Sequence, residues 1–577
     1  MHYIDWIVLA STIVFIVGYG MYKTRSTNTV ESYLLGDRDL KWWTIGLSIM
    51  ATQASGITFL STPGQAYEEG MGFVQFYLGL PVAMVILSIF VIPIYYRLKV
   101  YTAYEYLEGR FDLRTRTLTA ILFLIQRGMA AGLTIYAPSI ILSTILSWNL
   151  MLTNVGMGVL VIGYTMFGGT KAVSETQQQQ MAIILIGLFV ALGVVMYKLP
   201  HDVSLMDSLN VAGKLNKINL IDFKFDFNNK YTFWTGMIGG TFLFLSYFGT
   251  DQSQVQRYLS GKTLTESRLG LLFNGILKVP MQFFVLFTGV MVFMFYQFTM
   301  PPVHFNPGNV AIVESSKDKA AFQQLEQSHA EIFEQKKTAI YSLIAANHSG
   351  DATAIKHETT NVQDCINDDE AVRNQVKTLL KQQPSIPEKG ENDGDYIFIN
   401  FVLHHLPIGV VGLLVAVIFA AAMSSISSEL NALATTTVID IYRRTLRPNR
   451  SDKHYLRASM FFTAVWGVLA LLFATIASLF DNLIEAVNMI GSLFYGVILG
   501  IFAVAFFFKS IKGTAVFWSA FISEAIILLL FALDKWHYIH IAYLWFNLIG
   551  CALVIAWSFA IQPFSKDDNQ WKNADIS

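Results

Sequence analysis

Apolar segments long enough to cross a bilayer recur along almost the whole chain, and this feature limits the possible folds more than any other. A membrane-spanning helix needs about 20 consecutive, mostly apolar residues. Only 14% of the residues are charged, whereas typical soluble domains have about 25%. We therefore predict an all-α integral membrane protein with about 13 transmembrane helices. The predicted spans are 3–22, 43–66, 71–97, 117–147, 150–167, 178–197, 233–250, 267–298, 406–438, 457–479, 482–508, 513–533 and 540–561.

Composition and motifs exclude several classes of function. The net charge of -1 gives no basic surface for DNA or RNA. The sequence has no HExxH, GxSxG or Walker A motif, and no His/Cys cluster with the spacing of metal ligands. We therefore expect no enzymatic activity, no ATP-driven pumping, no cofactor and no nucleic-acid partner.

Positive residues in alternate short loops predict the orientation in the membrane. Lys and Arg follow the first, third, seventh, ninth and eleventh predicted spans, and they are absent after the second, fourth and tenth. Cytoplasmic loops carry the excess of Lys and Arg. This pattern predicts a multi-pass protein of the plasma membrane, with the N-terminus outside and a cytoplasmic tail at 562–577.

Two connections between spans are long, and both are predicted to lie outside. They cover residues 198–232 and 299–405. In the longer one, 312–346 has apolar residues at helical spacing, and 368–383 can form a second helix before a turn signal. We predict an extracellular helical hairpin, which is either an elaborated loop without its own function or a lid or docking element.

Polar residues crowd the second predicted span before Pro63 and Gly64. Polar and helix-breaking residues are expensive within a membrane, so this run favours a helix that unwinds near its middle and frees carbonyl groups for a cation. A packing face of small residues is the alternative interpretation. We expect Gln53, Ser55 and Thr58 to line a binding site at this point.

The predicted span 406–438 contains a cluster of serines. Ala421, Ser424 and Ser425 are spaced so that they share one helix face, and Ser424 and Ser428 are four residues apart. Small residues with adjacent hydroxyl groups leave room and hard oxygen ligands for an ion such as Na⁺. A hydroxyl-lined packing seam is the alternative.

Two further features suggest a substrate site in the membrane. Tyr247 precedes Gly249, which is expected to break the span, and it is either a gate over the substrate or a core aromatic residue. Arg127 and Lys278 lie deep in their spans, and no acid at comparable depth is expected to neutralise them. Ionisable residues within membranes are functional candidates by default, although either cation could instead bond to backbone carbonyls.

Several motifs together resemble the sodium/solute symporter family, which includes sodium–glucose, iodide, monocarboxylate, multivitamin and sialic acid symporters. The matching stretches are SYLLGDRDLKWWTIGLSIMATQASGITFLSTPGQAYEEG, IYAPSIIL, MFGGTKAV, GTDQSQVQRYLSGK and AAAMSSISSELNALATTTVIDIY. The resemblance covers nearly the whole chain except the large outer loop.

This resemblance implies a LeuT-like fold with two inverted repeats of five helices each. It divides the chain into a peripheral span at 1–22, a first half at 43–197, a second half at 233–508 that contains 299–405, and two C-terminal spans at 513–561. The substrate would lie at the midplane between the two broken spans.

The resemblance also assigns roles to individual residues. It implies a sodium site made of the carbonyls of Ala51, Ala54 and Ala421 and the hydroxyls of Ser424 and Ser425. It places the inner gate on Tyr247 and a substrate-proximal lysine on Lys278, and an arginine on the equivalent of span 117–147 binds the substrate carboxylate in sialic acid symporters. A second sodium site would involve Gln177, Ser427 and Ser428, but the family's carboxylate is replaced by Gln177.

The resulting prediction is sodium-coupled uptake of a small organic solute, carboxylate-bearing or otherwise anionic, by a monomeric unit in the lipid bilayer. A sodium/sugar symporter is the alternative, although Ile57 and Thr58 replace the Glu–Gln pair of galactose-type members. A sodium-independent channel or uniporter is a further alternative.

Overall fold

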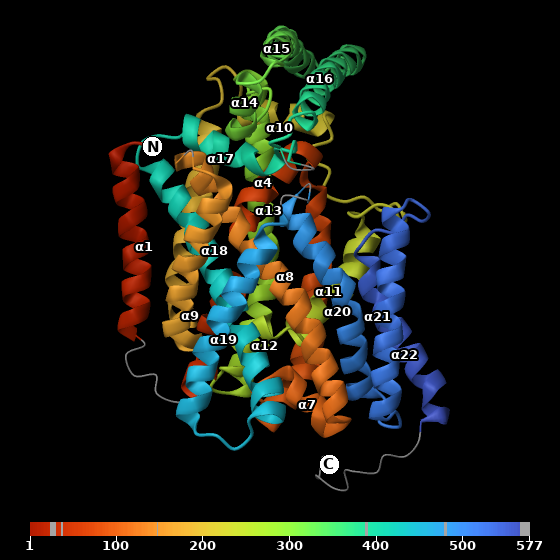
Figure 1. The fold of residues 1–577 in the computed structure, drawn as a ribbon. Helices are drawn as coiled ribbons and strands as arrows, with labels where there is room; N and C mark the ends of the chain where they lie inside the picture. The colour runs from red at the N-terminus through yellow and green to blue at the C-terminus, as the bar shows by residue number, and fades with distance from the viewer. Residues whose placement is uncertain are drawn as a thin grey trace.

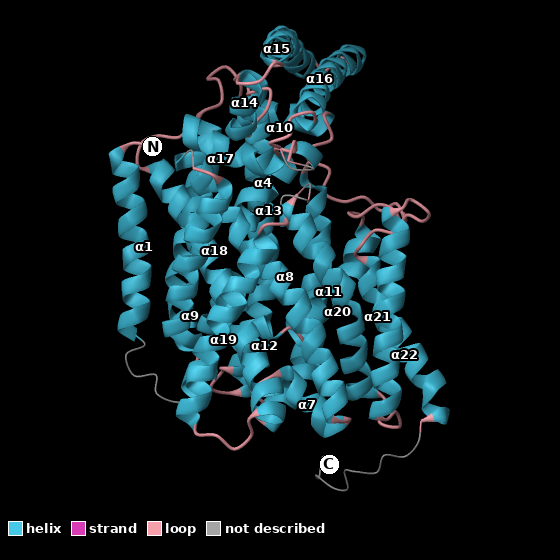
Figure 2. Cartoon of the chain, viewed as in Figure 1, coloured by secondary structure: helices cyan, strands magenta, loops and turns pink. Residues whose placement is uncertain are grey.

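Helices form almost all of the regular structure (Figure 2). The computed structural model describes residues 1–23, 30–35, 38–146, 148–386, 390–477, 480 and 482–565. Within these ranges, the extended structure amounts to one isolated bridge between Leu40 and Gly261. The prediction of an all-α chain is therefore confirmed.

The helices run side by side in a bundle from which α15 and α16 project at one end (Figure 1). We call this the hairpin end. α1 begins at the hairpin end, and α22 finishes at the opposite end. Up to the first long loop, the elements are α1 (Tyr3–Lys23), α2 (Val30–Leu35), α3 (Trp42–Gln53), α4 (Gly56–Glu69), the 3-10 helix η2 (Met71–Leu78), α5 (Gly79–Ile86), the π-helix η3 (Leu87–Val91), α6 (Ile92–Leu98), α7 (Ala103–Arg110), α8 (Leu113–Leu146) and α9 (Leu150–Tyr197).

The second part of the chain supplies the hairpin and the rest of the bundle. Its elements are α10 (Leu205–Lys214), the π-helix η4 (Thr235–Gly240), α11 (Thr241–Gly249), α12 (Gln252–Leu259), α13 (Leu264–Phe298), α14 (Pro307–Glu314), α15 (Lys319–Ser349), α16 (Ala352–Lys381), α17 (Gly394–His405), α18 (Val410–Thr436), the π-helix η5 (Thr437–Leu446), α19 (Asp452–Ala474), α20 (Leu483–Phe507), α21 (Gly513–Lys535), α22 (Trp545–Ile561) and the 3-10 helix η7 (Gln562–Phe564).

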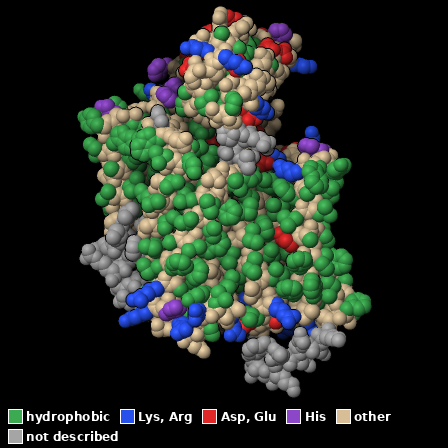
Figure 3. Space-filling model, viewed as in Figure 1, with side chains coloured by type: hydrophobic (Ala, Val, Ile, Leu, Met, Phe, Trp, Pro, Cys, Tyr) green, Lys and Arg blue, Asp and Glu red, His purple; other side chains and the backbone are tan. Residues whose placement is uncertain are grey.

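Nine helices of the described chain are long and apolar enough to cross a membrane. The other predicted spans correspond to shorter apolar helices near residues 3–16 and 150–163, or to spans that are interrupted. The predicted spans 150–167 and 178–197 both lie within one helical element, α9. Hydrophobic side chains cover most of the bundle on the face in Figure 3, whereas charged side chains gather on the hairpin and at the opposite end. This distribution is the one expected for a protein surrounded by lipid.

Local sequence signals explain where several helices begin. Asn482 accepts hydrogen bonds from the backbone amides of Ile484 and Glu485, at 2.9 and 3.3 Å, and so caps α20. Ser204 and Asp207 form a reciprocal capping box at the start of α10. Each cap satisfies amide groups that the first turn of a helix leaves without partners.

The predicted helical hairpin is confirmed as α15 and α16, which pack against each other. Its second helix begins at Ala352, earlier than the predicted residue 368, and 315–318 separate α14 from α15. A buried charge cluster holds the two helices together. Asp369 on α16 accepts hydrogen bonds from His329 Nδ1 at 2.5 Å and Lys336 Nζ at 3.2 Å on α15. Burial opposes ionisation of Asp369, but the His329 hydrogen bond and the Lys336 charge outweigh it, and they hold the pKa of Asp369 well below its ordinary value.

Helix α18 has a central position that explains how the site is built. It packs against α1, α3, α4, α8, α9, α12 and α19. The approach of α4 is especially close, because a Cβ atom on Gly56 would lie 3.0 Å from the Cβ of Ala422. Glycine and alanine at this crossing bring the serines of α18 to the junction between α3 and α4.

Candidate functional site

The predicted break in the second span is confirmed at Ala54 and Ser55, between α3 and α4. Both residues leave helical geometry, with ψ values of 76° and 170°. The amide of Ser55 bonds to the carbonyl of Gln53, not to that of Ala51 as a continuing helix requires. The break therefore exposes carbonyl groups of the last turn of α3 inside the bundle.

Serine hydroxyls of α18 occupy the space beside these carbonyls. Ser424 Oγ donates to the carbonyl of Ala51 at 3.1 Å. Ser425 Oγ donates to the carbonyl of Thr52 at 3.0 Å and lies 3.4 Å from that of Ala51. Ala54 lies at the end of α3, and Ala421 lies one turn before the serines on α18. Both residues are fully buried. Hard oxygen atoms without a carboxylate are a donor set that suits Na⁺.

The residues considered for a second sodium site form a hydrogen-bonded cluster that shares Ser424 with the first site. The Nε2 atom of Gln177 donates to Ser424 Oγ and Ser428 Oγ, both at 2.9 Å, and to Thr52 Oγ1 at 3.0 Å. Its Oε1 atom accepts from the hydroxyl of Ser48. Ser427 instead donates to the Ser424 carbonyl within α18, at 3.0 Å. Of the two serines considered for the second site, the Gln177 amide thus already binds the hydroxyl oxygen of Ser428.

The second helix break lies between α11 and α12, at Thr250 and Asp251. Asp251 caps α12, because its Oδ1 atom accepts from the amide and hydroxyl of Ser253 at 2.9 and 2.7 Å. Tyr247 precedes the break, and its hydroxyl accepts a hydrogen bond from Gln254 at 2.6 Å. The prediction that this span is broken after Gly249 is confirmed.

A cavity of about 70 Å³ lies between the two breaks. Most of the predicted substrate residues line it, namely Gln53, Ser55, Thr58, Arg127 and Tyr247. Lys278 is not among the lining residues. Its ammonium group is buried, lies 5.7 Å from the ring centroid of the cavity residue Tyr77, and has no hydrogen-bond partner among the described residues.

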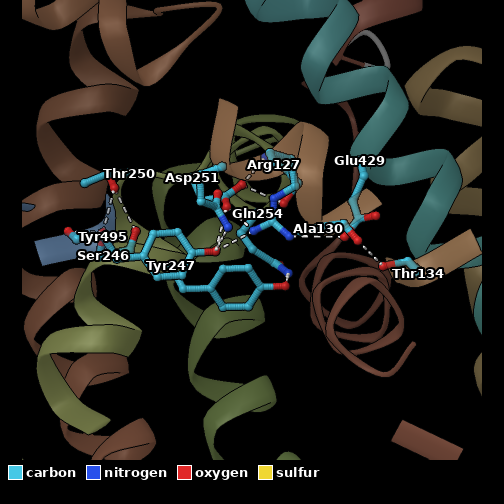
Figure 4. A network of polar contacts seen from close by, with 12 residues as sticks. Arg127, Ala130, Thr134, Ser246, Tyr247, Thr250, Asp251, Gln254, Glu429 and Tyr495 are labelled. Carbon is cyan, nitrogen blue, oxygen red and sulfur yellow. Dashed lines mark hydrogen bonds and ion pairs between the residues drawn. The ribbon is translucent and has the colours of Figure 1, made fainter. Parts of the chain in front are cut away.

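The expectation that no acid neutralises Arg127 is wrong. Two buried carboxylates flank its guanidinium group (Figure 4): Asp251 binds one terminal nitrogen, and Glu429 binds the other at 3.1 Å. The hydroxyl of Tyr495 lies 2.5 Å from the nitrogen that binds Asp251, and it donates to the Asp251 carboxylate at 3.0 Å. The Tyr247 ring centroid lies 5.3 Å from the guanidinium carbon. Sequence reasoning identified Arg127 and Tyr247 but missed both acids and Tyr495.

Comparison with known proteins identifies the family of the chain. The family model "Sodium:solute symporter family" matches residues 33–332 and 377–523, which excludes most of the α15–α16 hairpin. The chain belongs to the sodium:solute symporter family. This family and the relatives below are transporters and not enzymes, in agreement with the prediction from motifs.

Individual relatives show how far the similarity extends. The chain is 24% identical to sodium-coupled monocarboxylate transporter 2 of Mus musculus over 511 residues, which cover 88% of this chain and 69% of the relative. It is 32% identical to the sodium/iodide cotransporter of Homo sapiens over 297 residues, which cover 51% of this chain and 45% of the relative. The structure of a sodium-coupled sialic acid symporter in a substrate-bound, outward-open state has the same fold, with a TM-score of 0.73, 21% identity, and coverage of 99% of this chain and 100% of that one.

Proposed function

We propose that this protein is a secondary symporter that couples the entry of Na⁺ to the uptake of a small organic solute by alternating access. The observation that carries the proposal is the broken end of α3, where carbonyls of Ala51 and Thr52 face the hydroxyls of Ser424 and Ser425. Sodium would be bound there by oxygen atoms of two helices, and would therefore stabilise the conformation in which these helices are together.

The proposal includes the finer architecture that the sequence predicts. About 13 spans would cross the plasma membrane, with the hairpin and N-terminus outside and the C-terminus in the cytoplasm. Two inverted repeats, at 43–197 and 233–508, would each begin with a broken helix. The breaks at Ala54–Ser55 and Thr250–Asp251 support this division, because transporters of this kind use discontinuous helices in corresponding positions of the two halves.

The driving force would come from the sodium gradient. One charge that moves across a potential of 100 mV supplies about 2.3 kcal/mol, to which the concentration ratio adds. We propose one sodium ion per cycle, because the second cluster has the neutral Gln177 in place of a carboxylate. A second ion there would lose its hydration without a compensating charge.

We propose a small anionic solute, with a carboxylate as the best candidate. The support is the guanidinium of Arg127 in the cavity, which can bind a carboxylate with two hydrogen bonds, and the similarity to relatives named for monocarboxylates and iodide. The cavity of about 70 Å³ has room for roughly five water molecules or a solute of a few non-hydrogen atoms. Since Asp251 and Glu429 already pair with Arg127, an anion would have to replace one of them.

Uptake into proteoliposomes tests the proposed function. The panel contains short monocarboxylates, iodide, vitamins, sialic acid and sugars, each with Na⁺ outside, Na⁺ inside or no Na⁺. We expect accumulation of an anion only with an inward sodium gradient. Flux without sodium would instead indicate a channel or uniporter.

Variants of Arg127 then test the charge of the solute. Arg127→Gln should weaken its apparent affinity by about 2 kcal/mol or more, and Arg127→Lys by less, while Na⁺ binding persists. A transported neutral sugar whose affinity survives Arg127→Gln would refute the anionic substrate.

A further inference from the structure

The carboxylate of Glu429 is only partly used by the groups around it. One oxygen, Oε1, accepts a hydrogen bond from Arg127 at 3.1 Å. The other, Oε2, is buried and has no hydrogen-bond partner among the described residues, and the side chain lines the central cavity. The nearby Thr134 hydroxyl donates instead to the carbonyl of Ala130 in its own helix, α8, at 3.0 Å (Figure 4). Burial of a charged oxygen atom without a partner is energetically unfavourable, so a cation beside Oε2 would stabilise this carboxylate.

Glu429 also lies close to the proposed sodium site along α18. It follows Ser425 by four residues, so the two side chains share one face of the helix. Such positions place their Cβ atoms about 5–6 Å apart. The carboxylate therefore lies within one helical turn of the ion site and at the same time contacts Arg127 in the cavity.

When both acids are ionised, the charges of the cluster do not balance without an ion. Arg127 contributes one positive charge, whereas Asp251 and Glu429 contribute two negative charges. Tyr247 and Tyr495, which also pack on the cluster, are uncharged phenols. One negative charge is left over in a region of low dielectric constant, where an unbalanced charge is strongly unfavourable. A sodium ion near Ser425 would cancel it.

We propose that Glu429 is a positioning residue that couples the sodium site to the substrate cavity, because its carboxylate is shared between Arg127 and the sodium ion. Without Na⁺, Glu429 pairs with Arg127. With Na⁺ bound, the carboxylate of Glu429 interacts with the ion. Arg127 then remains paired with Asp251, and its other terminal nitrogen can bind an anionic group of the solute. This inference rests on the proposed function, and it gives a physical reason why the solute would bind after the ion.

The inference predicts competition, since Arg127 and Na⁺ would both attract the same carboxylate. The test measures equilibrium binding of ²²Na⁺ to the purified full-length protein without any solute. Glu429→Gln should weaken Na⁺ binding about tenfold or more, as one partly screened charge pair is lost. Arg127→Gln should strengthen Na⁺ binding in the parent protein, but should have little effect when Glu429→Gln is also present.

Glu429→Asp is the matched control, because it keeps the charge and shortens the reach toward Arg127. It should bind Na⁺ at least as tightly as the parent, and thermal unfolding confirms that each variant is folded. If Arg127→Gln proves unstable, Arg127→Lys replaces it in the double-variant comparison, with a smaller expected gain. Equal Na⁺ affinity of the parent and Glu429→Gln, or equal effects of the Arg127 variant in both backgrounds, would overturn the inference. Absence of saturable Na⁺ binding in the parent would instead contradict the proposed function.

Discussion

Replacement of Ser425 by alanine is the most direct perturbation of the candidate sodium site. The Ser425 hydroxyl lies 3.0 Å from the carbonyl of Thr52 and 3.4 Å from that of Ala51. Alanine removes one oxygen atom and leaves the backbone of α18 unchanged. The substitution therefore removes one ligand from the site without altering the helix break that supplies the carbonyls.

The expected magnitude follows from the burial of this hydroxyl. Ser425 is only 1% exposed, so water has little access to replace the lost oxygen. Loss of a polar partner in such a place costs about 1–3 kcal/mol. Since 1.4 kcal/mol corresponds to a factor of ten, the Na⁺ concentration for half-maximal uptake should rise about tenfold or more. Ser424→Ala should have an effect of similar size, because Ser424 also bonds to the Ala51 carbonyl.

The assay is initial uptake of the identified solute into proteoliposomes across a range of external Na⁺. Ser459→Ala is the matched control, because that serine is equally buried but donates only to the carbonyl of Tyr455 in its own helix, α19. We expect the control to retain the parent's Na⁺ dependence. An unchanged Na⁺ dependence in both Ser424→Ala and Ser425→Ala would refute the sodium-site assignment.

Two further predictions concern the number of ions and the hairpin. The Na⁺ dependence of uptake should be hyperbolic with a Hill coefficient near one, because Gln177 occupies the second cluster with a neutral amide; a clearly sigmoidal curve, or a reversal potential that fits two ions, would contradict this. Asp369→Asn should loosen α15 from α16 by about 3–5 kcal/mol, because it leaves the buried Lys336 without a counter-charge. Faster hydrogen exchange across the two helices would reveal the change. Since the pKa of Asp369 is lowered, its contribution should be complete above about pH 4 for as long as Lys336 is protonated, and strong acidification should abolish it.

The broken helices could be predicted from the sequence because their signals are local. In the second span, polar residues and a proline follow each other where an uninterrupted membrane helix would be apolar. The serine cluster of α18 could also be predicted from the sequence, because the spacing of the serines places their hydroxyl groups on one face of the helix. The structure adds that these two elements meet, which depends on close packing at Gly56 and Ala422 and has no local signal.

The acids around Arg127 were missed because depth was estimated by counting residues along continuous helices. That count places Asp251 near the inner end of its span. The chain instead breaks at Thr250 and turns, which keeps Asp251 beside Arg127 and Tyr495. Glu429 had a usable signal, since it follows Ser425 by four residues and shares its face, but the serines around it favoured a purely hydroxyl-lined interpretation.

The start of α16 was misplaced for a different reason. The stretch from Ala352 has few apolar residues, and its buried positions include Val362, Cys365 and the charged Asp369. A search for apolar spacing therefore found only the later part of the helix. Burial of an ion-paired carboxylate between helices is a tertiary property that hydrophobic periodicity does not detect.

The two helix breaks differ in how their free carbonyls are satisfied, and this difference explains why we place the ion at only one of them. At the α11–α12 break, the phenols of Tyr95, Tyr104 and Tyr258 donate to the carbonyls of Gly249, Thr250 and Phe248, at 2.9, 2.9 and 3.1 Å. All three tyrosines are buried.

A cation at that break would have to displace bulky aromatic side chains from a close-packed core. At the α3–α4 break, the corresponding partners are the small hydroxyls of Ser424 and Ser425. A serine hydroxyl can rotate its hydrogen away and present its oxygen to an ion without moving the helix. Both breaks expose carbonyl groups inside the membrane. At the α11–α12 break the tyrosines occupy these carbonyls and exclude an ion, whereas at the α3–α4 break the serine hydroxyls leave oxygen ligands available for sodium.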